Sequence, residues 1–116
     1  MSHPWIQLES ESQFEEAVKG SFGRPVVFFK HSTRCAISSM ALNRLNSADA
    51  EIYQDVECYF LDLLKHRGLS NKMADDFSVY HQSPQLLLVK NGECVFEASH
   101  GDIQPRELKE QLALLT

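Results

Sequence analysis

The stretch VVFFKHSTRCAISSMALNRL, residues 26–45, contains a predicted strand, a turn and a predicted helix in that order. Val26 to Phe29 is a continuous run of apolar, β-forming residues, which is typical of a strand buried on both faces of a parallel sheet. Residues 31–34 interrupt this run, and from Cys35 onward apolar residues recur at helical spacing. A buried strand that leads through a short turn into a helix beginning near Cys35 indicates an α/β protein.

The flanking sequence continues the alternation of strands and helices in both directions. Further strands are predicted near residues 5–8, 58–63, 85–89 and 94–98, and the pair Asn91-Gly92 predicts a hairpin turn between the last two. Further helices are predicted after a cap at Ser10 or Ser12, after a cap at Ser70, and from Pro105 onward. The resulting order, βαβαβα followed by ββα, predicts a thioredoxin-like α/β fold with a central mixed sheet flanked by helices.

Size and charge exclude several classes of function. The length of 116 residues and the hydrophobic fraction of 43% fit one globular domain, which we place at residues 1–116. The formal net charge is −5 and Lys and Arg form no cluster, which argues against a nucleic-acid partner. No apolar run approaches the length of a membrane span, and residues 1–5 lack the pattern of a secretory signal. We therefore expect a cytoplasmic monomer that does not bind a membrane.

The three cysteines divide into one candidate for chemistry and two for the core. Cys35 stands where a buried strand gives way to a helix, and a helix N-terminus favours the thiolate over the thiol. Because the thiolate is the nucleophile of disulfide exchange, Cys35 is the predicted catalytic residue. Cys58 lies in a predicted apolar strand, and Cys94 is predicted to share the buried face of its strand with Phe96 and Ala98. An odd number of cysteines without a Cys-x-x-Cys pair suits a reducing compartment.

Ser38 follows Cys35 by three residues, so it lies one turn further along the same helix face. In a dithiol enzyme this position holds the resolving cysteine, whereas a hydroxyl can donate a hydrogen bond to a thiolate but cannot form a disulfide. The Cys-x-x-Ser pattern therefore predicts monothiol exchange, in which Ser38 stabilises the thiolate and an outside thiol releases Cys35. The simpler interpretation is that Ser38 is an ordinary serine in the first turn of a helix.

Candidate substrate contacts come from two further segments. Ser83-Pro84 directly precedes the predicted hairpin strand. In a thioredoxin-like fold a cis proline at this place abuts the cysteine, and the residue before it offers backbone groups to an extended substrate, so both residues are predicted to contact substrate. The turn residues Thr33 and Arg34, next to the cysteine, are predicted substrate contacts as well.

Two histidines are expected at the same sheet edge as Cys35. The second hairpin strand should run parallel to the strand at Val26–Phe29, so residues 99–102 would lie at the edge of Cys35. His31 and His100 are therefore candidates for tuning the thiol or for binding polar groups of a thiol substrate. No Cys/His spacing in the sequence matches a metal site. The other histidines are interpreted as surface or packing residues: His3, His66 and His81.

Three segments resemble the signatures of the YtxJ-type monothiol bacilliredoxins, which are thioredoxin-like proteins of the bacillithiol system. These segments are FKHSTRCAIS at residues 29–38, VYHQSPQ at residues 79–85 and ASHGDI at residues 98–103. The similarity extends from about Trp5 to the last helix, and three motifs in order at matching spacing are specific. Bacillithiol is a low-molecular-weight thiol that some bacteria use in place of glutathione.

The resemblance implies that Cys35 attacks mixed disulfides between bacillithiol and proteins and carries the bacillithiol away, with Pro84 as the cis proline. Bacillithiol would be a co-substrate rather than a tightly bound cofactor, and the partners would be bacillithiolated proteins and a low-molecular-weight thiol. Two positions depart from the family pattern. Ala36 replaces the usual proline after the cysteine, and Gly101 stands where an aromatic residue that could contact the sugar of the bound thiol is expected.

Two other functions fit parts of the sequence. One is a glutathione-linked monothiol glutaredoxin, which uses a Cys-Gly-Phe-Ser loop and can hold an iron–sulfur cluster, but Ala36-Ile37 in place of Gly-Phe disfavours it. The other is a thioredoxin-fold binding or chaperone module without redox activity, which a Cys35 thiol of ordinary reactivity would favour.

Overall fold

The computed structural model describes residues 5–48 and 50–115, and the predicted surface residue His3 lies outside them. The strands are β1 (Ile6–Gln7), β2 (Val26–His31), β3 (Glu57–Asp62), β4 (Gln85–Lys90) and β5 (Glu93–Ser99). The helices are α1 (Glu11–Gly20), α2 (Ala36–Asn46), α3 (Arg67–Phe77) and α4 (Pro105–Ala113), with short 3₁₀ helices η1 (Ala50–Tyr53) and η2 (His100–Asp102). The predicted order βαβαβαββα is confirmed for the described residues, with the 3₁₀ helices added to it.

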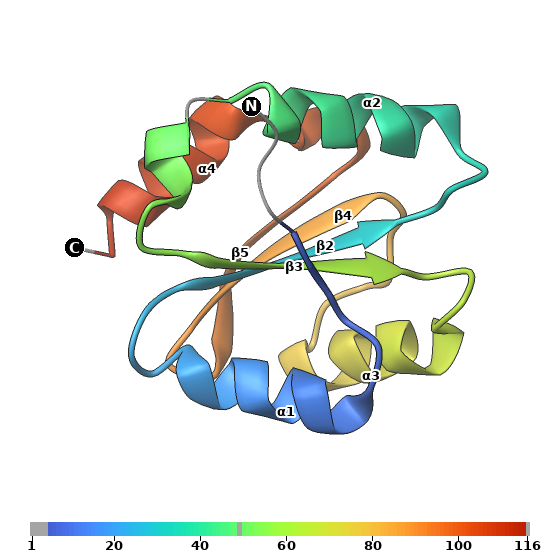
Figure 1. Ribbon diagram of the computed structural model, residues 1–116, viewed down its shortest axis with the longest axis horizontal. Coiled ribbons are helices and arrows are strands. Elements are labelled where there is room, and N and C mark those ends of the chain that lie inside the picture. The colour runs from blue at the N-terminus through green and yellow to red at the C-terminus, as the bar shows by residue number, and fades with distance from the viewer. Residues whose placement is uncertain (1–4, 49, 116) are drawn as a thin grey trace.

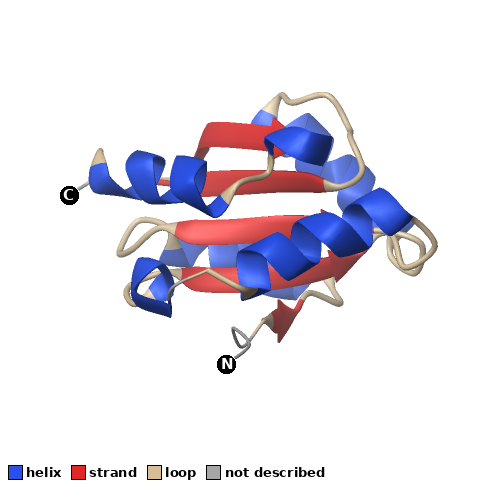
Figure 2. Ribbon diagram, turned by 90° about the horizontal axis from the view of Figure 1, so that it is seen from above, coloured by secondary structure: helices blue, strands red, loops and turns tan. Residues whose placement is uncertain are grey.

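The strands form one mixed sheet in the order β1-β3-β2-β4-β5. β2 is parallel to β3 and antiparallel to β4, and β5 is antiparallel to β4, so β5 runs parallel to β2 as predicted. Figure 1 shows α2 and α4 on one face of the sheet and α1 and α3 on the other. Figure 2 looks onto the face that α2 and α4 cover. Within the described ranges, no helix has the length and hydrophobicity needed to cross a bilayer.

The sheet separates two hydrophobic cores, and β2 contributes to both because it is central. All six residues of β2 are buried: the four of the predicted apolar run, and also Lys30 and His31, which the run did not include. Val27 and Phe29 belong to the core beneath α2 and α4, whereas Val26 and Phe28 belong to the core beneath α1 and α3. The carboxyl ends of β2 and β3 point to the same edge of the sheet, on the right in Figure 1, where the chain turns back into α2.

Several predicted boundaries differ from the structure, and two of them need an explanation, at the first strand and at α3. The first strand comprises only Ile6–Gln7 rather than residues 5–8. Ser70 does not cap α3, because the helix begins at Arg67 with His66 as its N-cap, and Ser70 is buried inside it. The cause is local: the Asp62 carboxylate accepts hydrogen bonds from the backbone N–H groups of the second and third residues after it, which makes a tight turn directly after β3.

The hairpin between β4 and β5 contains the predicted Asn91-Gly92 turn, in which both residues have positive φ, 54° and 78°. The predicted face of Cys94 was wrong, because β5 contains a β-bulge. Phe96 opposes Leu88 but Cys94 opposes Val89, so one extra residue lies between the two pairs. Cys94 consequently packs against the core beneath α1 and α3, while Phe96 packs against the core beneath α2 and α4.

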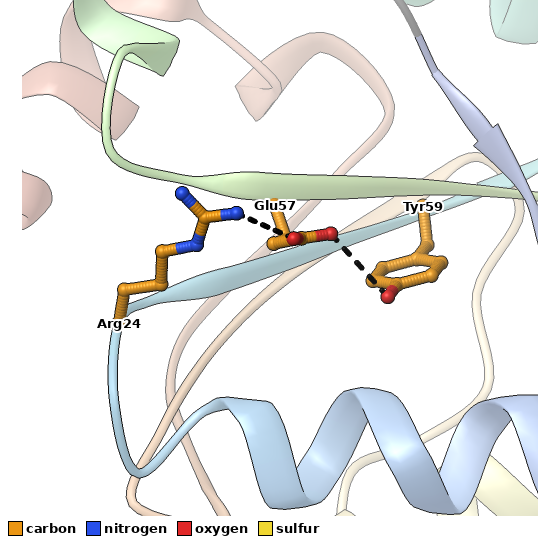
Figure 3. A network of polar contacts seen from close by, with 3 residues as sticks. All are labelled: Arg24, Glu57 and Tyr59. Atoms are coloured by element: carbon orange, nitrogen blue, oxygen red, sulfur yellow. Dashed lines mark hydrogen bonds and ion pairs between the residues drawn. The ribbon is translucent and has the colours of Figure 1, made fainter.

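The opposite end of β2 and β3 carries a small polar network, drawn in Figure 3. Arg24, just before β2, forms an ion pair with Glu57, the first residue of β3. The other carboxylate oxygen of Glu57 accepts a hydrogen bond of 3.4 Å from the Tyr59 hydroxyl. Burial and the nearby Glu57 carboxylate raise the pKa of Tyr59. This network lies at the amino-terminal ends of β2 and β3, away from the start of α2.

Candidate functional site

Cys35 is the N-cap of α2 and is half-buried, in the position that the sequence predicted. Its backbone N–H donates to the Ser32 carbonyl at 3.2 Å, and its carbonyl accepts from the Ser39 N–H at 3.1 Å. Among the described residues, the Cys35 side chain makes no capping hydrogen bond to the helix. The backbone on both sides of the thiol is therefore fixed, while the sulfur remains available to another partner.

Ser38 is fully buried, and its hydroxyl has two partners. The Ser32 backbone N–H donates to its Oγ at 3.1 Å, and Oγ lies 2.7 Å from Nδ1 of His31. The sequence predicted a hydrogen bond from Ser38 to the Cys35 thiolate, whereas in the structure the hydroxyl contacts the histidine. The strand before the turn supplies this competing partner, which helical spacing alone does not reveal.

His31, the last residue of β2, lies below the surface with an exposed fraction of 5%. Its ring centroid is 5.9 Å from that of Phe29 and 5.2 Å from that of Phe60. Burial lowers the pKa of His31, and the Asp62 carboxylate on the paired strand opposes this effect. The sequence left open whether His31 binds substrate or tunes the thiol, and its burial favours tuning.

The segment around Ser83-Pro84 is hydrogen-bonded through the backbone to the segment around His100. The Ser83-Pro84 peptide bond is cis, as predicted, and Pro84 is buried. The Pro84 carbonyl accepts a hydrogen bond of 3.2 Å from the backbone N–H of His100. The Ser83 hydroxyl oxygen is buried and has no hydrogen-bond partner within the described residues. Residues 83–84 and η2 thus lie next to each other.

The segment at η2 is fixed to α2 and open to solvent. Arg44 of α2 donates to the carbonyls of His100 at 3.1 Å and Ile103 at 2.9 Å. His100 itself is exposed, with a φ of 53°. A Cβ atom at Gly101 would meet nothing within 4 Å, so the missing side chain leaves open space. A hollow of about 370 Å³ adjoins this segment, lined in part by Ser99, Gly101 and Asp102.

The turn between β2 and α2 presents the remaining predicted substrate contacts. Thr33 and Arg34 are both exposed, directly before Cys35. A substrate that reaches the sulfur can therefore contact either side chain without a rearrangement of the core.

Sequence reasoning missed Lys30, which is fully buried in β2. Its Nζ donates to the Ser70 carbonyl at 3.0 Å and lies 3.4 Å from Nδ1 of His81, which also lies 3.2 Å from the Ser70 hydroxyl. Burial lowers the pKa of Lys30 to about 8. The available signal was a lysine at the end of a run predicted to be buried on both faces, a place where lysine is rare unless it has a partner.

Gln85 is the register partner of Lys30 on β4 and is also fully buried. Its side-chain amide donates to the Tyr80 carbonyl at 3.0 Å, and its carbonyl oxygen accepts from the Gln82 N–H at 3.3 Å. The Lys30 and Gln85 side chains therefore both contact residues 80–82 from the sheet. These residues lead directly into Ser83-Pro84, so the two buried polar groups position the predicted substrate segment.

The other two cysteines, Cys58 and Cys94, have raised pKa values because they are buried in whole or in part. Cys58 is 2% exposed, as predicted for a core cysteine, and burial raises the pKa of its thiol. Burial also raises the pKa of Cys94 to about 11. The thiols of Cys58 and Cys94 therefore stay protonated at neutral pH, which makes both poor nucleophiles.

Solved structures of known proteins share this architecture. A protein solved as a candidate oxidoreductase with a thioredoxin fold is 34% identical, matches over 90% of each chain and has a TM-score of 0.78. Thioredoxin O2 from Arabidopsis thaliana is 25% identical over 96% of this chain and 93% of its own, with a TM-score of 0.72. Mitochondrial thioredoxin 3 from Saccharomyces cerevisiae shows the same fold at 16% identity, over 94% and 93% of the chains, with a TM-score of 0.74.

The fold, the thiol at the start of α2 and these similarities define a thioredoxin-fold thiol–disulfide oxidoreductase. The predicted fold class is thereby confirmed. The family model described as monothiol bacilliredoxin BrxC matches residues 6–108. The chain therefore belongs to the monothiol bacilliredoxin family, as the three sequence signatures indicated.

Proposed function

We propose that this protein removes bacillithiol from protein mixed disulfides by thiol–disulfide exchange at Cys35. The observation that carries the proposal is the contrast among the three thiols. Cys35 is half-exposed at a helix N-terminus, where the helix dipole favours a thiolate, whereas burial raises the pKa values of Cys58 and Cys94. Membership of the bacilliredoxin family supports bacillithiol as the thiol that is exchanged.

The exchange proceeds in two displacements. The Cys35 thiolate attacks the bacillithiol sulfur of the mixed disulfide, a new S–S bond forms, the old one breaks, and the substrate protein leaves as a thiolate that takes a proton from water. Cys35 then carries bacillithiol as a mixed disulfide. A second thiol, either free bacillithiol or a partner protein, attacks this disulfide and regenerates Cys35. Ser38 cannot resolve the adduct because a hydroxyl forms no disulfide.

The surroundings of the thiol support a substrate path in this proposal. Thr33 and Arg34 lie on the exposed turn directly before Cys35, and Ser83-Pro84 supplies the backbone against which an extended substrate would lie. The exposed ring of His100 and the open space at Gly101 adjoin that segment and offer a place for the polar part of bacillithiol. We propose the cytoplasm as the compartment, because the exchange needs a reducing thiol pool.

Intact-mass spectrometry after incubation with oxidised bacillithiol tests the proposal. One bacillithiol adduct is expected on the wild-type protein and on Cys58→Ser, and none on Cys35→Ser. Oxidised glutathione is the matched control, and its adduct should form more slowly. A mixed disulfide of bacillithiol and a model protein should lose its bacillithiol only when Cys35 is present.

Other outcomes point to the alternatives. Equal rates with the two disulfides would contradict bacillithiol specificity and favour a glutathione-linked protein. A Cys35 that forms no adduct with either disulfide would contradict exchange altogether and favour a binding module without redox activity.

A further inference from the structure

The hydrogen bond between Ser38 and His31 bears on the proposed nucleophile, because a serine hydroxyl has only one hydrogen to donate. Ser38 Oγ accepts the Ser32 backbone N–H at 3.1 Å and lies 2.7 Å from Nδ1 of His31. The Ser32 contact uses a lone pair of the oxygen and leaves the hydroxyl hydrogen free to choose an acceptor. Both Ser38 and His31 are buried, so water does not compete readily for this hydrogen.

The state of His31 Nδ1 decides where the Ser38 hydrogen points. When Nδ1 carries no hydrogen, it is an acceptor and the Ser38 hydroxyl donates to it. When Nδ1 carries a hydrogen, it donates to Ser38 Oγ, and the hydroxyl hydrogen needs a different acceptor. A histidine can make this change at constant charge, by moving its single hydrogen from Nε2 to Nδ1 through exchange with solvent.

Cys35 is the acceptor that the helix start offers. Cys35 is the N-cap of α2 and Ser38 is the third helical residue, and residues three apart lie on the same side of a helical turn. The Cys35 side chain has no capping hydrogen bond of its own within the described residues. A sulfur anion at this position is therefore a suitable partner for the hydroxyl hydrogen once His31 no longer accepts it.

The neighbours of His31 include two aromatic rings and one carboxylate. Its ring packs against Phe29 and Phe60, which are uncharged and also contact each other. On β3 the paired residue Asp62 supplies a carboxylate whose charge acts on His31, and Cys35 begins the helix that carries Ser38. The Asp62 carboxylate is itself held by backbone N–H groups of the following turn.

We propose that His31 is a positioning residue for Cys35 and acts through Ser38, donating from Nδ1 when Cys35 is a thiolate and accepting at Nδ1 when it is not. This inference rests on Cys35 being the nucleophile of the proposed function. When the thiol ionises, its proton leaves to solvent, the Ser38 hydrogen turns from Nδ1 to the sulfur, and the imidazole hydrogen moves from Nε2 to Nδ1. By linkage, each of these states favours the other.

Nitrogen NMR of the His31 ring tests the coupling directly, because the ¹⁵N shifts distinguish a protonated from a bare Nδ1. The spectra are recorded at about pH 9.5, where a free thiol is largely ionised and a histidine is neutral. Wild type should show a hydrogen on Nδ1 of His31, and Cys35→Ala should show it on Nε2. In Ser38→Ala, changing Cys35 to Ala should leave the His31 tautomer unchanged. His81 is the internal control and should be the same in all variants.

The pH profile of Cys35 alkylation by iodoacetamide gives a second readout with opposite signs for the two partners. Ser38→Ala should raise the pH midpoint by about one unit, because a hydrogen bond to the thiolate is lost. His31→Phe removes the competing acceptor and retains an aromatic ring, so it should lower the midpoint. The double variant should match Ser38→Ala. A purely structural role for His31 would move the midpoint upward or leave it unchanged.

The same His31 tautomer in wild type and Cys35→Ala would overturn the inference, as would a higher alkylation midpoint in His31→Phe. These readouts follow the thiolate and not bacillithiol. A tautomer change together with no bacillithiol adduct would therefore uphold the coupling while the proposed function fails, and the reverse result would do the opposite.

Discussion

Lys30 and His31 are neighbours in β2, but they serve opposite layers of the molecule because successive side chains of a strand point to opposite faces. Lys30 contacts Ser70 of α3 and His81 on the side of α1 and α3. His31 contacts Ser38 on the side of α2. Each is buried, and each fixes one of the two segments that the proposed reaction needs. Lys30 holds the residues before the cis peptide, and His31 holds the start of the helix that carries the thiol.

The difference between the two residues lies in what their polar atoms can do. A lysine ammonium only donates, so Lys30 is a fixed anchor for the segment that would receive substrate. An imidazole nitrogen either accepts or donates, so the contact from His31 to Ser38 can adjust when the charge on a neighbour changes. The segment before Ser83-Pro84 is thus held by a fixed donor, while Ser38, in the first turn of the helix that follows Cys35, is held by a hydrogen bond that can reverse.

The largest expected effect comes from removing the fixed anchor. Lys30→Ala should lower the free energy of unfolding by about 3 kcal/mol, because the buried alkyl chain leaves a cavity and the Ser70 carbonyl loses its donor. Urea unfolding at neutral pH measures this loss. The exposed Lys65 gives the matched control, and Lys65→Ala should change stability by less than about 0.5 kcal/mol. Equal losses of stability in the two variants would show that the buried contacts of Lys30 do not stabilise the fold.

The charge of the same residue gives a somewhat smaller effect with a defined sign. The pKa of Lys30 is about 8 in the folded protein and near 10.4 in the unfolded chain, so between these values the unfolded chain binds more protons. Relative to Lys30→Met, the wild-type protein should therefore gain slightly less than about 3 kcal/mol of stability from pH 7.5 to pH 10.5. Unfolding curves of both proteins across this range measure the difference. A constant difference would show that Lys30 keeps its charge in the fold.

His31 should make the stability of the protein depend on pH in the acid range. Burial lowers the pKa of His31 below that of the unfolded chain, so the unfolded chain binds the extra proton first as the pH falls below about 6.5. Wild type should lose stability relative to His31→Phe in that range, by less than the Lys30 effect because the Asp62 carboxylate opposes the shift. Thermal unfolding at pH 7.5 and pH 5.5 measures it. If the wild-type protein became more stable relative to His31→Phe at pH 5.5, the lowered pKa of His31 would be contradicted.

The smallest effect is expected at the far end of the same strands. Arg24 and Glu57 form a solvent-exposed ion pair, so a double-mutant cycle with Arg24→Ala and Glu57→Ala should give a coupling of about 0.5 kcal/mol. Sodium chloride at 1 M should reduce this coupling, whereas it should leave the buried Lys30 contact unchanged. A coupling as large as the Lys30 loss would show that polar contacts stabilise both ends of the sheet equally.

The fold could be predicted because its signals are local and repeated. The apolar run at Val26–Phe29, the Asn91-Gly92 turn and Pro105 each identify one element, and their order leaves few topologies. The site was predicted only in part. Cys35 and Ser83-Pro84 follow from their places between elements, but the contact of Ser38 with His31 depends on the depth of the strand below the helix.

The missed residues share one physical reason. Lys30 and Gln85 are register partners on neighbouring strands and both bond residues 80–82, which lie far from Lys30 in sequence, so no local pattern joins Lys30 to Gln85 or to that segment. Cys94 was assigned to the wrong face because alternation along a strand fails at a bulge, and the bulge depends on how β5 pairs with β4.

The β-bulge in β5 also bears on whether molecules of this protein pair through their sheet edges at high concentration. β5 forms one edge of the sheet, and edge strands offer unpaired N–H and C=O groups to strands of other molecules. The extra residue at Val95 breaks the regular spacing of these groups, and the exposed side chains of Glu93 and Glu97 add like charges along the strand. At the other edge, β1 has two residues, too few to pair with a long strand of another molecule. We therefore expect concentrated solutions of this protein to resist growing the continuous sheets that lead to fibrils.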